Sequence, residues 1–219
     1  MAEPEDSASR ADRAAGDIRS LLISGGLVPG QRLSETALGE TLGVSRNTLR
    51  EAFRELTSER LLTRRPHAGV FVAVPGLSSI IDIYRVRRIV EGQALGTASP
   101  GHPAGARMHT AVESAADSAA AGDWVAVGTA NMEFHSAIVA LADSVRLDRL
   151  YANISAELRL AFGLLDDPEY LHRPYVERNT HVLGLYDGGD SAGAAAALDA
   201  YLVHSERTVL AAYSRRIPR

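Results

Sequence analysis

The 219-residue sequence predicts a mainly α-helical protein with an N-terminal winged helix-turn-helix and a C-terminal all-α antiparallel helical bundle. Two short helical patterns with matching start signals follow one another across a single glycine. Two short apolar runs then flank a turn that contains proline and glycine, which is typical of a β-hairpin. Later in the chain the pattern changes to long helical stretches rich in Ala and Leu, without strand-like alternation. We therefore expect two domains, residues 10–75 and residues 76–219.

The first helix is expected to follow a disordered tail over residues 1–9, in which Glu, Asp, Ala and Ser show no periodicity. Ile18 and Leu22 lie on one helical face, and Gly25-Gly26 ends the helix. The N-terminal domain is thus predicted to open with one amphipathic helix.

The next two helices are predicted by their start signals. Ser34 and Ser45 are good N-cap residues, because a serine hydroxyl accepts a hydrogen bond from a free backbone N–H of the first turn. Gly43 leaves only a short turn between the helices, as a helix-turn-helix requires. The second of these helices, from Arg46 to about Ser58, carries one apolar stripe made of Leu49, Ala52, Phe53 and Leu56.

A β-hairpin, the wing, is expected after this helix. Its strands are the apolar runs Leu61–Thr63 and Val70–Val74, and the segment 64–69 between them contains a proline and a glycine that favour a turn. The bundle that follows is predicted from helical periodicity interrupted by Pro, Gly and Asp. Its helices are expected near residues 77–99, 102–121, 123–142, 144–165, 172–187 and 191–214.

The composition is that of a globular protein, with 46% hydrophobic and 23% charged residues. Cysteine is absent, which excludes a disulfide framework and a thiolate metal site and fits a reducing cytoplasm. No apolar run approaches the roughly 20 residues that span a bilayer. The start of the chain lacks the basic-then-apolar order of a signal peptide. We therefore expect a cytoplasmic protein without a membrane partner.

The charge of the chain is unevenly distributed. The net charge of −4 argues against a nucleic-acid partner at first sight. However, all 23 basic residues are Arg, and between Leu42 and Pro75 there are six Arg against three Glu. The guanidinium group suits both phosphate and guanine edges, so this segment is a candidate DNA-binding surface.

The start of the third helix has the chemistry needed to read DNA. The major groove admits one helix, whose N-terminal side chains contact base edges; Arg pairs with guanine and Asn with adenine. A solvated arginine face on an ordinary helix is the alternative, but the paired caps and the basic hairpin favour DNA. The candidate residues are Ser45, Arg46, Asn47 and Arg50 on the helix, and Arg64, Arg65, His67 and Gly69 on the hairpin.

The N-terminal region resembles the GntR-type bacterial regulators. The segments 26–35 and 42–52, GLVPGQRLSE and LGVSRNTLREA, match that family's DNA-binding signature, as does Gly69–Val72 at the wing. A regulator of this kind is expected to bind a double-stranded, inverted-repeat operator as a homodimer, because one recognition helix covers only a half-site. The resemblance places Ser45, Arg46, Asn47, Arg50 and Gly69 at DNA-contacting positions.

The bundle contains a possible metal site. Asn131 and His135 are four residues apart and share one helical face, and His181 and His204 lie on later helices. Three imidazoles and an amide can converge inside a bundle as a metal site. Spacing alone leaves this open, because single histidines are more often exposed or hydrogen-bonded in a core.

The C-terminal region resembles the FCD domain, the all-helical ligand-binding domain of FadR-type regulators. The resemblance rests on Asn131–His135, Glu177–His181, Gly189-Asp190 and His204. In many FCD domains an Asp or Asn and three His bind a divalent metal. The resemblance therefore implies a zinc or nickel ion, the ions that imidazole ligands favour. Its expected ligands are Asn131, His135, His181 and His204.

The effector is expected to be a small organic acid. Arg87 and Glu91 match the family's Arg-x-x-x-Glu pattern, and a cavity-facing arginine can clamp a carboxylate. The alternative is a surface ion pair worth about 0.3 kcal/mol. Arg159 is a weaker candidate for the same role.

The sequence thus predicts a DNA-binding transcriptional regulator, not an enzyme, whose operator affinity depends on an effector. The alternatives are a metal-free ligand sensor, an architectural DNA binder, and a metal-dependent enzyme domain fused to a DNA-binding domain, since three His around a metal also build hydrolytic sites. The chain contains no His-Glu-x-x-His run, serine nucleophile elbow or glycine-rich phosphate loop, which favours a regulator.

Overall fold

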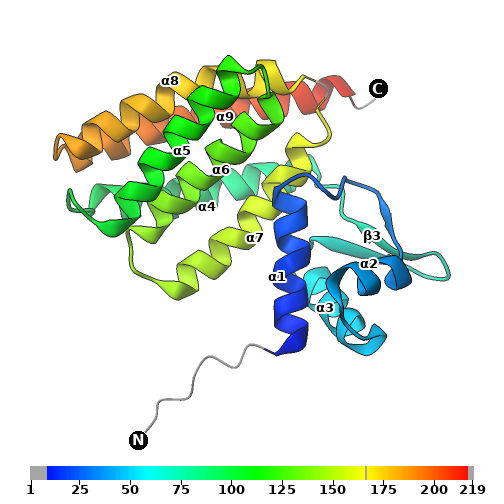
Figure 1. The fold of residues 1–219 in the computed structure, drawn as a ribbon. Coiled ribbons are helices and arrows are strands. Elements are labelled where there is room, and N and C mark those ends of the chain that lie inside the picture. The colour runs from blue at the N-terminus through cyan, green and yellow to red at the C-terminus, as the bar shows by residue number, and fades with distance from the viewer. Residues whose placement is uncertain (1–8, 166, 217–219) are drawn as a thin grey trace, which may run out of the picture. The chain divides into compact units, whose positions relative to one another are not determined.

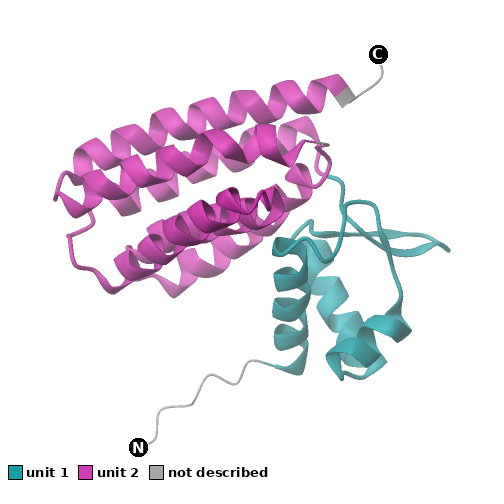
Figure 2. Cartoon of the chain, turned by 45° about the horizontal axis from the view of Figure 1, so that its top comes forward, with its two compact units in different colours: residues 1–74 teal, residues 75–219 magenta. Residues whose placement is uncertain are grey.

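The computed structural model describes residues 9–165 and 167–216, and the chain divides into two compact units, Met1–Val74 and Pro75–Arg219 (Figure 2). Most of the predicted N-terminal tail, residues 1–8, lies outside the described residues. Ser9, which was expected in the tail, is instead the N-cap of the first helix. Its hydroxyl accepts a hydrogen bond from the backbone N–H of Asp12, whose side chain accepts one from Ser9 in return.

Unit 1 is a winged helix-turn-helix, as the sequence predicts (Figure 1). Its three strands form an antiparallel sheet in the order β1-β3-β2. The elements are α1 (Arg10–Ile23), β1 (Arg32–Leu33), α2 (Glu35–Leu42), α3 (Arg46–Ser58), β2 (Leu62–Arg65) and β3 (Gly69–Val72).

The predicted caps define the helix-turn-helix. The Ser34 hydroxyl accepts a hydrogen bond from the N–H of Ala37, and the Ser45 hydroxyl accepts one from the N–H of Thr48. Gly43 ends α2 with φ of 63°, in the left-handed region that glycine enters without a steric penalty. These local signals fix where α3 begins.

The wing has a shorter turn than the sequence predicts. Arg64 and Arg65 lie in β2, opposite Val70 and Gly69, so that only residues 66–68 form the turn. The strand β1, which pairs with β3, was not predicted. It has two residues, too few for an alternating pattern to be recognised.

The core of unit 1 joins α1 to α3. Ile18 and Leu22 of α1 and the predicted apolar stripe of α3 are buried. At the edge of this core Arg19 bridges two carboxylates, at 3.3 Å from Glu55 of α3 and 2.7 Å from Glu59, the C-cap residue of that helix. The face of α3 that carries the predicted DNA-binding residues is therefore held outward by packing on the opposite face.

Unit 2 is all-helical, as the sequence predicts. α5 packs along α6, α4 packs along α9, and α8 contacts both α6 and α9 (Figure 1). The helices are α4 (Leu77–Gly96), α5 (Pro103–Ala120), α6 (Trp124–Ala140), α7 (Val145–Phe162), α8 (Pro168–Asp187) and α9 (Ser191–Arg216).

α8 begins four residues before its predicted start. Asp167 is the N-cap, and its carboxylate accepts a hydrogen bond from the N–H of Tyr170. Pro168 occupies the first turn, where a missing N–H costs nothing. Pro174 lies inside the helix with its side chain exposed. The sequence pattern predicts a break between helices at Pro168, whereas this proline starts α8.

The core of unit 2 is a continuous apolar cluster built from every helix of the bundle, with Tyr84, Phe134 and Tyr186 among its fully buried members. In the part of the chain that the structure describes, no helix combines the length and the apolar character needed to cross a bilayer.

We predict opposite effects for two glycine substitutions in unit 1. Gly43→Ala should lower the free energy of unfolding by about 1 kcal/mol, because a Cβ meets no atom there but the left-handed backbone disfavours it. Gly16→Ala, in the interior of α1 and equally unobstructed, should raise that free energy by about 0.5–1 kcal/mol. Urea unfolding measures both. A change of the same sign in the two variants would contradict this account of the turn.

Candidate functional site

All eight predicted DNA-binding residues are exposed on α3 or the wing. Ser45 caps α3, and its hydroxyl also contacts that of Thr48 at 2.8 Å. The Arg46 guanidinium donates to the hydroxyl of Thr36 at 3.4 Å. The start of α3 therefore presents polar side chains that other residues of unit 1 help to orient.

A shallow groove lies between α3 and the wing. Three guanidinium groups line it, from Arg50 and Arg54 of α3 and Arg64 of β2, together with Glu35 of α2. The Arg50 Nε donates to the Glu35 carboxylate at 3.0 Å, and this pair is largely exposed. Arg54 is not among the DNA-binding residues that the sequence predicts. Its position beside Arg50 adds it to the candidate interface.

The tip of the wing is a tight basic turn. His67 has φ of 59° and Gly69 has φ of 107°, so both lie in the left-handed region. A Cβ on Gly69 would lie 3.4 Å from Nε of Arg32, an exposed arginine of the unpredicted strand β1. The Arg65 guanidinium lies 4.3 Å from the centre of the Phe71 ring. The sheet thus adds Arg32 to the basic surface and holds Arg65 in place.

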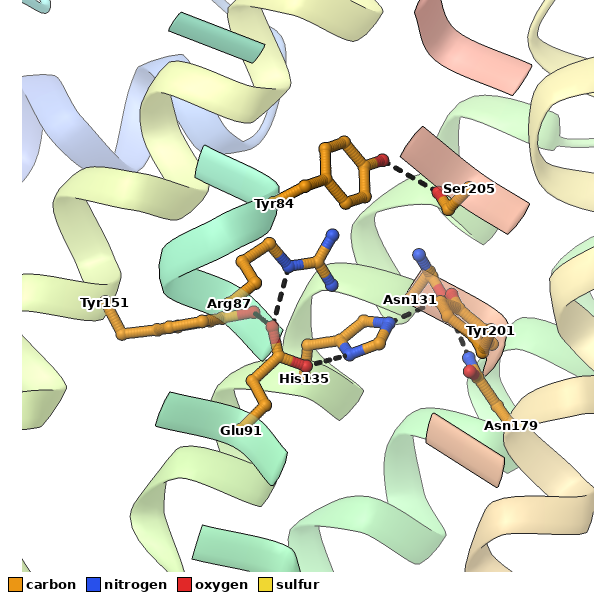
Figure 3. A network of polar contacts seen from close by, with 9 residues as sticks. All are labelled: Tyr84, Arg87, Glu91, Asn131, His135, Tyr151, Asn179, Tyr201 and Ser205. Carbon is orange, nitrogen blue, oxygen red and sulfur yellow. Dashed lines mark hydrogen bonds and ion pairs between the residues drawn. The ribbon is translucent and has the colours of Figure 1, made fainter. Parts of the chain in front are cut away.

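Unit 2 contains a buried polar network centred on Glu91 (Figure 3). Three groups donate to its carboxylate: Arg87 Nε at 2.7 Å, the Tyr151 hydroxyl at 2.6 Å and His135 Nδ1 at 2.6 Å. Because an ionised carboxylate only accepts hydrogen bonds, the proton of the His135 ring lies on Nδ1. The network continues from His135 Nε2, which lies 2.9 Å from the Tyr201 hydroxyl.

Electrostatics fix the charge states of this network. Burial alone would raise the pKa of Glu91, but the Arg87 guanidinium and the hydrogen bonds from His135 and Tyr151 lower it to about 2. Burial lowers the pKa of His135, so its imidazole is neutral near pH 7. Burial also raises the pKa of Tyr151 well above its usual value. The network therefore holds one cation, one anion and neutral donors.

Arg87 and Glu91, which were predicted to contact the effector, form an ion pair with each other. Their side chains are 3% and 0% exposed, so they form a buried ion pair and not the surface pair considered as the alternative. The positive charge of Arg87 is already balanced by Glu91. This arrangement makes Arg87 a weaker candidate for an effector carboxylate than the sequence pattern indicates.

The four predicted metal ligands do not converge. Asn131 and His135 are buried in the network, but His181 and His204 are exposed on α8 and α9. The reason is the direction of each side chain around its helix axis, which turns by about 100° per residue. A position two or three residues away from an inward-facing one therefore points about 200° or 300° around the helix from it. Within residues 9–165 and 167–216, no group of three or more His, Cys, Asp or Glu side chains is arranged to hold a metal ion.

A second polar cluster lies on α6, α7 and α8. Arg159, 7% exposed, makes no hydrogen bond or ion pair with any described residue. A Cβ on Gly128 would lie 2.9 Å from Arg159 Nη1 and 2.5 Å from Nε2 of His172, so the two side chains meet over this glycine. Burial, together with the charge of Arg159, lowers the pKa of His172 to about 3. The cluster thus contains a buried cation that no described residue balances.

Sequence reasoning missed the polar face of α8. His172, Tyr175 and Asn179 are buried at i, i+3 and i+7, a helical spacing that indicates one inward face. This signal was present but was obscured because the predicted helix began at residue 172, and because His181 matched the expected motif.

Each of the two units matches a different family of known proteins. Residues 10–72 match the family described as bacterial regulatory proteins, gntR family, and residues 82–204, more than half of the chain, match the FCD domain. The chain belongs to the GntR family and carries an FCD domain. This GntR-family protein is therefore a DNA-binding transcriptional regulator, in agreement with the sequence prediction.

The relatives of this GntR-family chain are named as regulators. It is 27% identical over 174 residues to a probable D-xylose utilization operon transcriptional repressor of Paenarthrobacter nicotinovorans, covering 74% of this chain and 77% of the relative. It is 30% identical over 137 residues to the Nta operon transcriptional regulator of Aminobacter aminovorans, covering 61% and 64%. The crystal structure of a putative transcriptional regulator GntR from Rhodococcus sp. RHA1 is 38% identical, with a TM-score of 0.85 over 94% of this chain and 100% of that one. All three of these relatives are named as transcriptional regulators or repressors.

We predict that His172 makes stability depend on pH between about 6.5 and 3. Its pKa is about 3 in the folded protein against 6.5 for the free group, so only the unfolded chain takes up this proton as the pH falls. The free energy of unfolding should therefore fall with decreasing pH, by at most about 1.4 kcal/mol per pH unit from this residue. His172→Gln should reduce the slope, whereas His181→Gln, at an exposed position, should leave it unchanged. Urea unfolding across this range measures the slopes; equal slopes in wild type and His172→Gln would contradict the assignment.

Proposed function

We propose that this regulator binds an inverted-repeat operator as a homodimer, and that a small organic acid bound within its helical domain changes its operator affinity. The DNA-binding part of the proposal is supported by the exposed polar start of α3 and the arginine-lined groove beside the wing. One copy of α3 spans a half-site, and a two-fold dimer matches a palindromic operator.

The exposed residues divide by role. Arg46, Asn47 and Arg50 lie at the N-terminal end of α3, which is the end that reaches base edges in the major groove. Arg54 and Arg64 flank the groove and suit phosphate contacts. The first group carries sequence preference, and the second supplies affinity that decreases with salt.

The effector part of the proposal rests on Arg159. A guanidinium that is 7% exposed and without a partner among the described residues is costly, since a buried charge is normally paired. A carboxylate would balance it and form two parallel hydrogen bonds. His172, neutral because burial and Arg159 lower its pKa, can contribute a further hydrogen bond without adding charge.

An organic acid bound there alters operator affinity only if it favours one arrangement of the dimer over another. Arg159 lies on the same helix as Tyr151, two turns away, and Tyr151 donates to Glu91 in the central network. A ligand on Arg159 therefore contacts a helix that is tied to α4 and α6. We propose that movement of α7 carries the effector signal.

We predict that Arg46→Ala and Arg50→Ala each weaken operator binding by about 1–3 kcal/mol, because a bidentate base contact is lost. Both side chains are exposed, so folding should be unaffected. Arg85→Ala, which removes the same charge from an exposed position of α4, is the matched control and should bind like wild type. Fluorescence anisotropy with the promoter DNA of the chain's own gene measures affinity; wild-type affinity in both α3 variants would show that α3 does not read the operator.

We predict that Arg159→Gln abolishes stabilisation by carboxylates while leaving operator binding intact. A thermal-shift screen of short monocarboxylates, dicarboxylates and hydroxy acids identifies compounds that stabilise the wild-type protein. Arg159→Gln should lose that shift, and Arg207→Gln, at an exposed position of α9, should keep it. A stabilising acid that binds Arg159→Gln as tightly as wild type would exclude Arg159 as its site. A stabilising acid that binds the wild-type protein without changing its operator affinity would not be an effector.

A further inference from the structure

Four side chains meet at the centre of the helical bundle: Asn131 and His135 of α6, Asn179 of α8 and Tyr201 of α9 (Figure 3). The Asn179 Nδ2 donates to Asn131 Oδ1 at 2.7 Å. The Tyr201 hydroxyl lies 2.8 Å from Asn131 Oδ1 and 2.9 Å from His135 Nε2, and its single proton can serve either acceptor. Asn179 and Tyr201 thus occupy the inward positions that the sequence assigned to His181 and His204.

The donor chemistry of this cluster does not suit a divalent ion. The FCD resemblance implies three imidazoles and one Asp or Asn, whereas the cluster has one imidazole, two neutral carboxamides and one phenol. The Tyr201 hydroxyl is a neutral phenol that is engaged with Asn131 Oδ1 and His135 Nε2, so it is a poor ligand. The only nitrogen of His135 with a free lone pair, Nε2, faces that hydroxyl.

The nearest carboxylate cannot complete a metal site. Glu91 already accepts hydrogen bonds from Arg87, Tyr151 and His135. Its negative charge is already balanced by Arg87, so it offers no free anionic ligand to a divalent ion. One buried acceptor, Asn179 Oδ1, has no partner among the described residues, and a single neutral oxygen does not replace the missing anionic or imidazole ligands.

We infer that the FCD domain of this chain is metal-free. The cluster of Asn131, His135, Asn179 and Tyr201 contains two of the four ligands that the resemblance implies, and it joins α6, α8 and α9 through hydrogen bonds alone. This inference does not depend on the effector or on Arg159.

The first test measures metal in the full-length, tag-free protein, purified without chelator. Elemental analysis by mass spectrometry should find far less than one zinc, nickel, manganese or iron atom per chain. The melting temperature should not change when zinc chloride, nickel chloride or EDTA is added. One divalent ion per chain, with a melting temperature that EDTA lowers, would overturn the inference.

The second test builds the missing ligands. Combining Asn179→His with Tyr201→His gives Asn131 and three imidazoles at the same four positions, and this variant should take up one nickel or zinc ion per chain and melt at a higher temperature with metal than without. His181→Gln with His204→Gln is the matched control and should behave like wild type in both tests. If the wild-type protein contained a bound metal ion and this control variant did not, the inference would also be overturned. A folded double-histidine variant that takes up no metal would show that these four positions do not form a metal site. If this variant does not fold, the metal content of the wild-type protein alone tests the inference.

Discussion

The ionised carboxylate of Glu91 is the interaction on which the helical domain depends. It is fully buried, and an isolated carboxylate there would be strongly unfavourable. Three donors from three different helices compensate for this cost: Arg87 from α4, Tyr151 from α7 and His135 from α6. Each donor must reach one of two oxygens, so the carboxylate sets the relative position of these helices more narrowly than apolar packing does.

The same requirement extends outward through His135. Its Nδ1 is committed to Glu91, so its Nε2 is left to contact Tyr201 of α9. Tyr201 and Asn179 both lie against Asn131. Five of the six helices are therefore connected by one chain of hydrogen bonds that starts at a single charge. In a domain of this kind a ligand that displaces one helix acts on all of those that share the network.

How much could be predicted depended on whether the signal was local. In unit 1 the serine caps and Gly43 act within one helical turn, and the sequence located α2 and α3 from them. In unit 2 the sequence identified Asn131 and His135, which share a helix, but not their partners on α8 and α9. The inward residue of a helix is set by packing against distant segments, and a shift of two residues exchanged the buried Asn179 for the exposed His181.

The effector candidates show the same limit. The spacing of Arg87 and Glu91 revealed a pair of charges but not whether an external ligand or the pair itself would satisfy them. Both side chains are enclosed and bonded to each other, which makes Arg87 a weaker candidate for binding an external ligand. No sequence motif marks Arg159 or His172. Their significance comes from the absence of a compensating anion among the described residues.

In the proposed DNA interface, the ion pair between Arg50 and Glu35 has a consequence for operator affinity. A recognition arginine that already has an intramolecular acceptor must exchange one partner for another when DNA binds. A guanine that offers two acceptors in the right plane compensates for the exchange, whereas a base that offers one poor contact does not. In the proposed interface Glu35 thus competes with DNA for Arg50, and the cost of breaking their ion pair is common to all operators that engage Arg50.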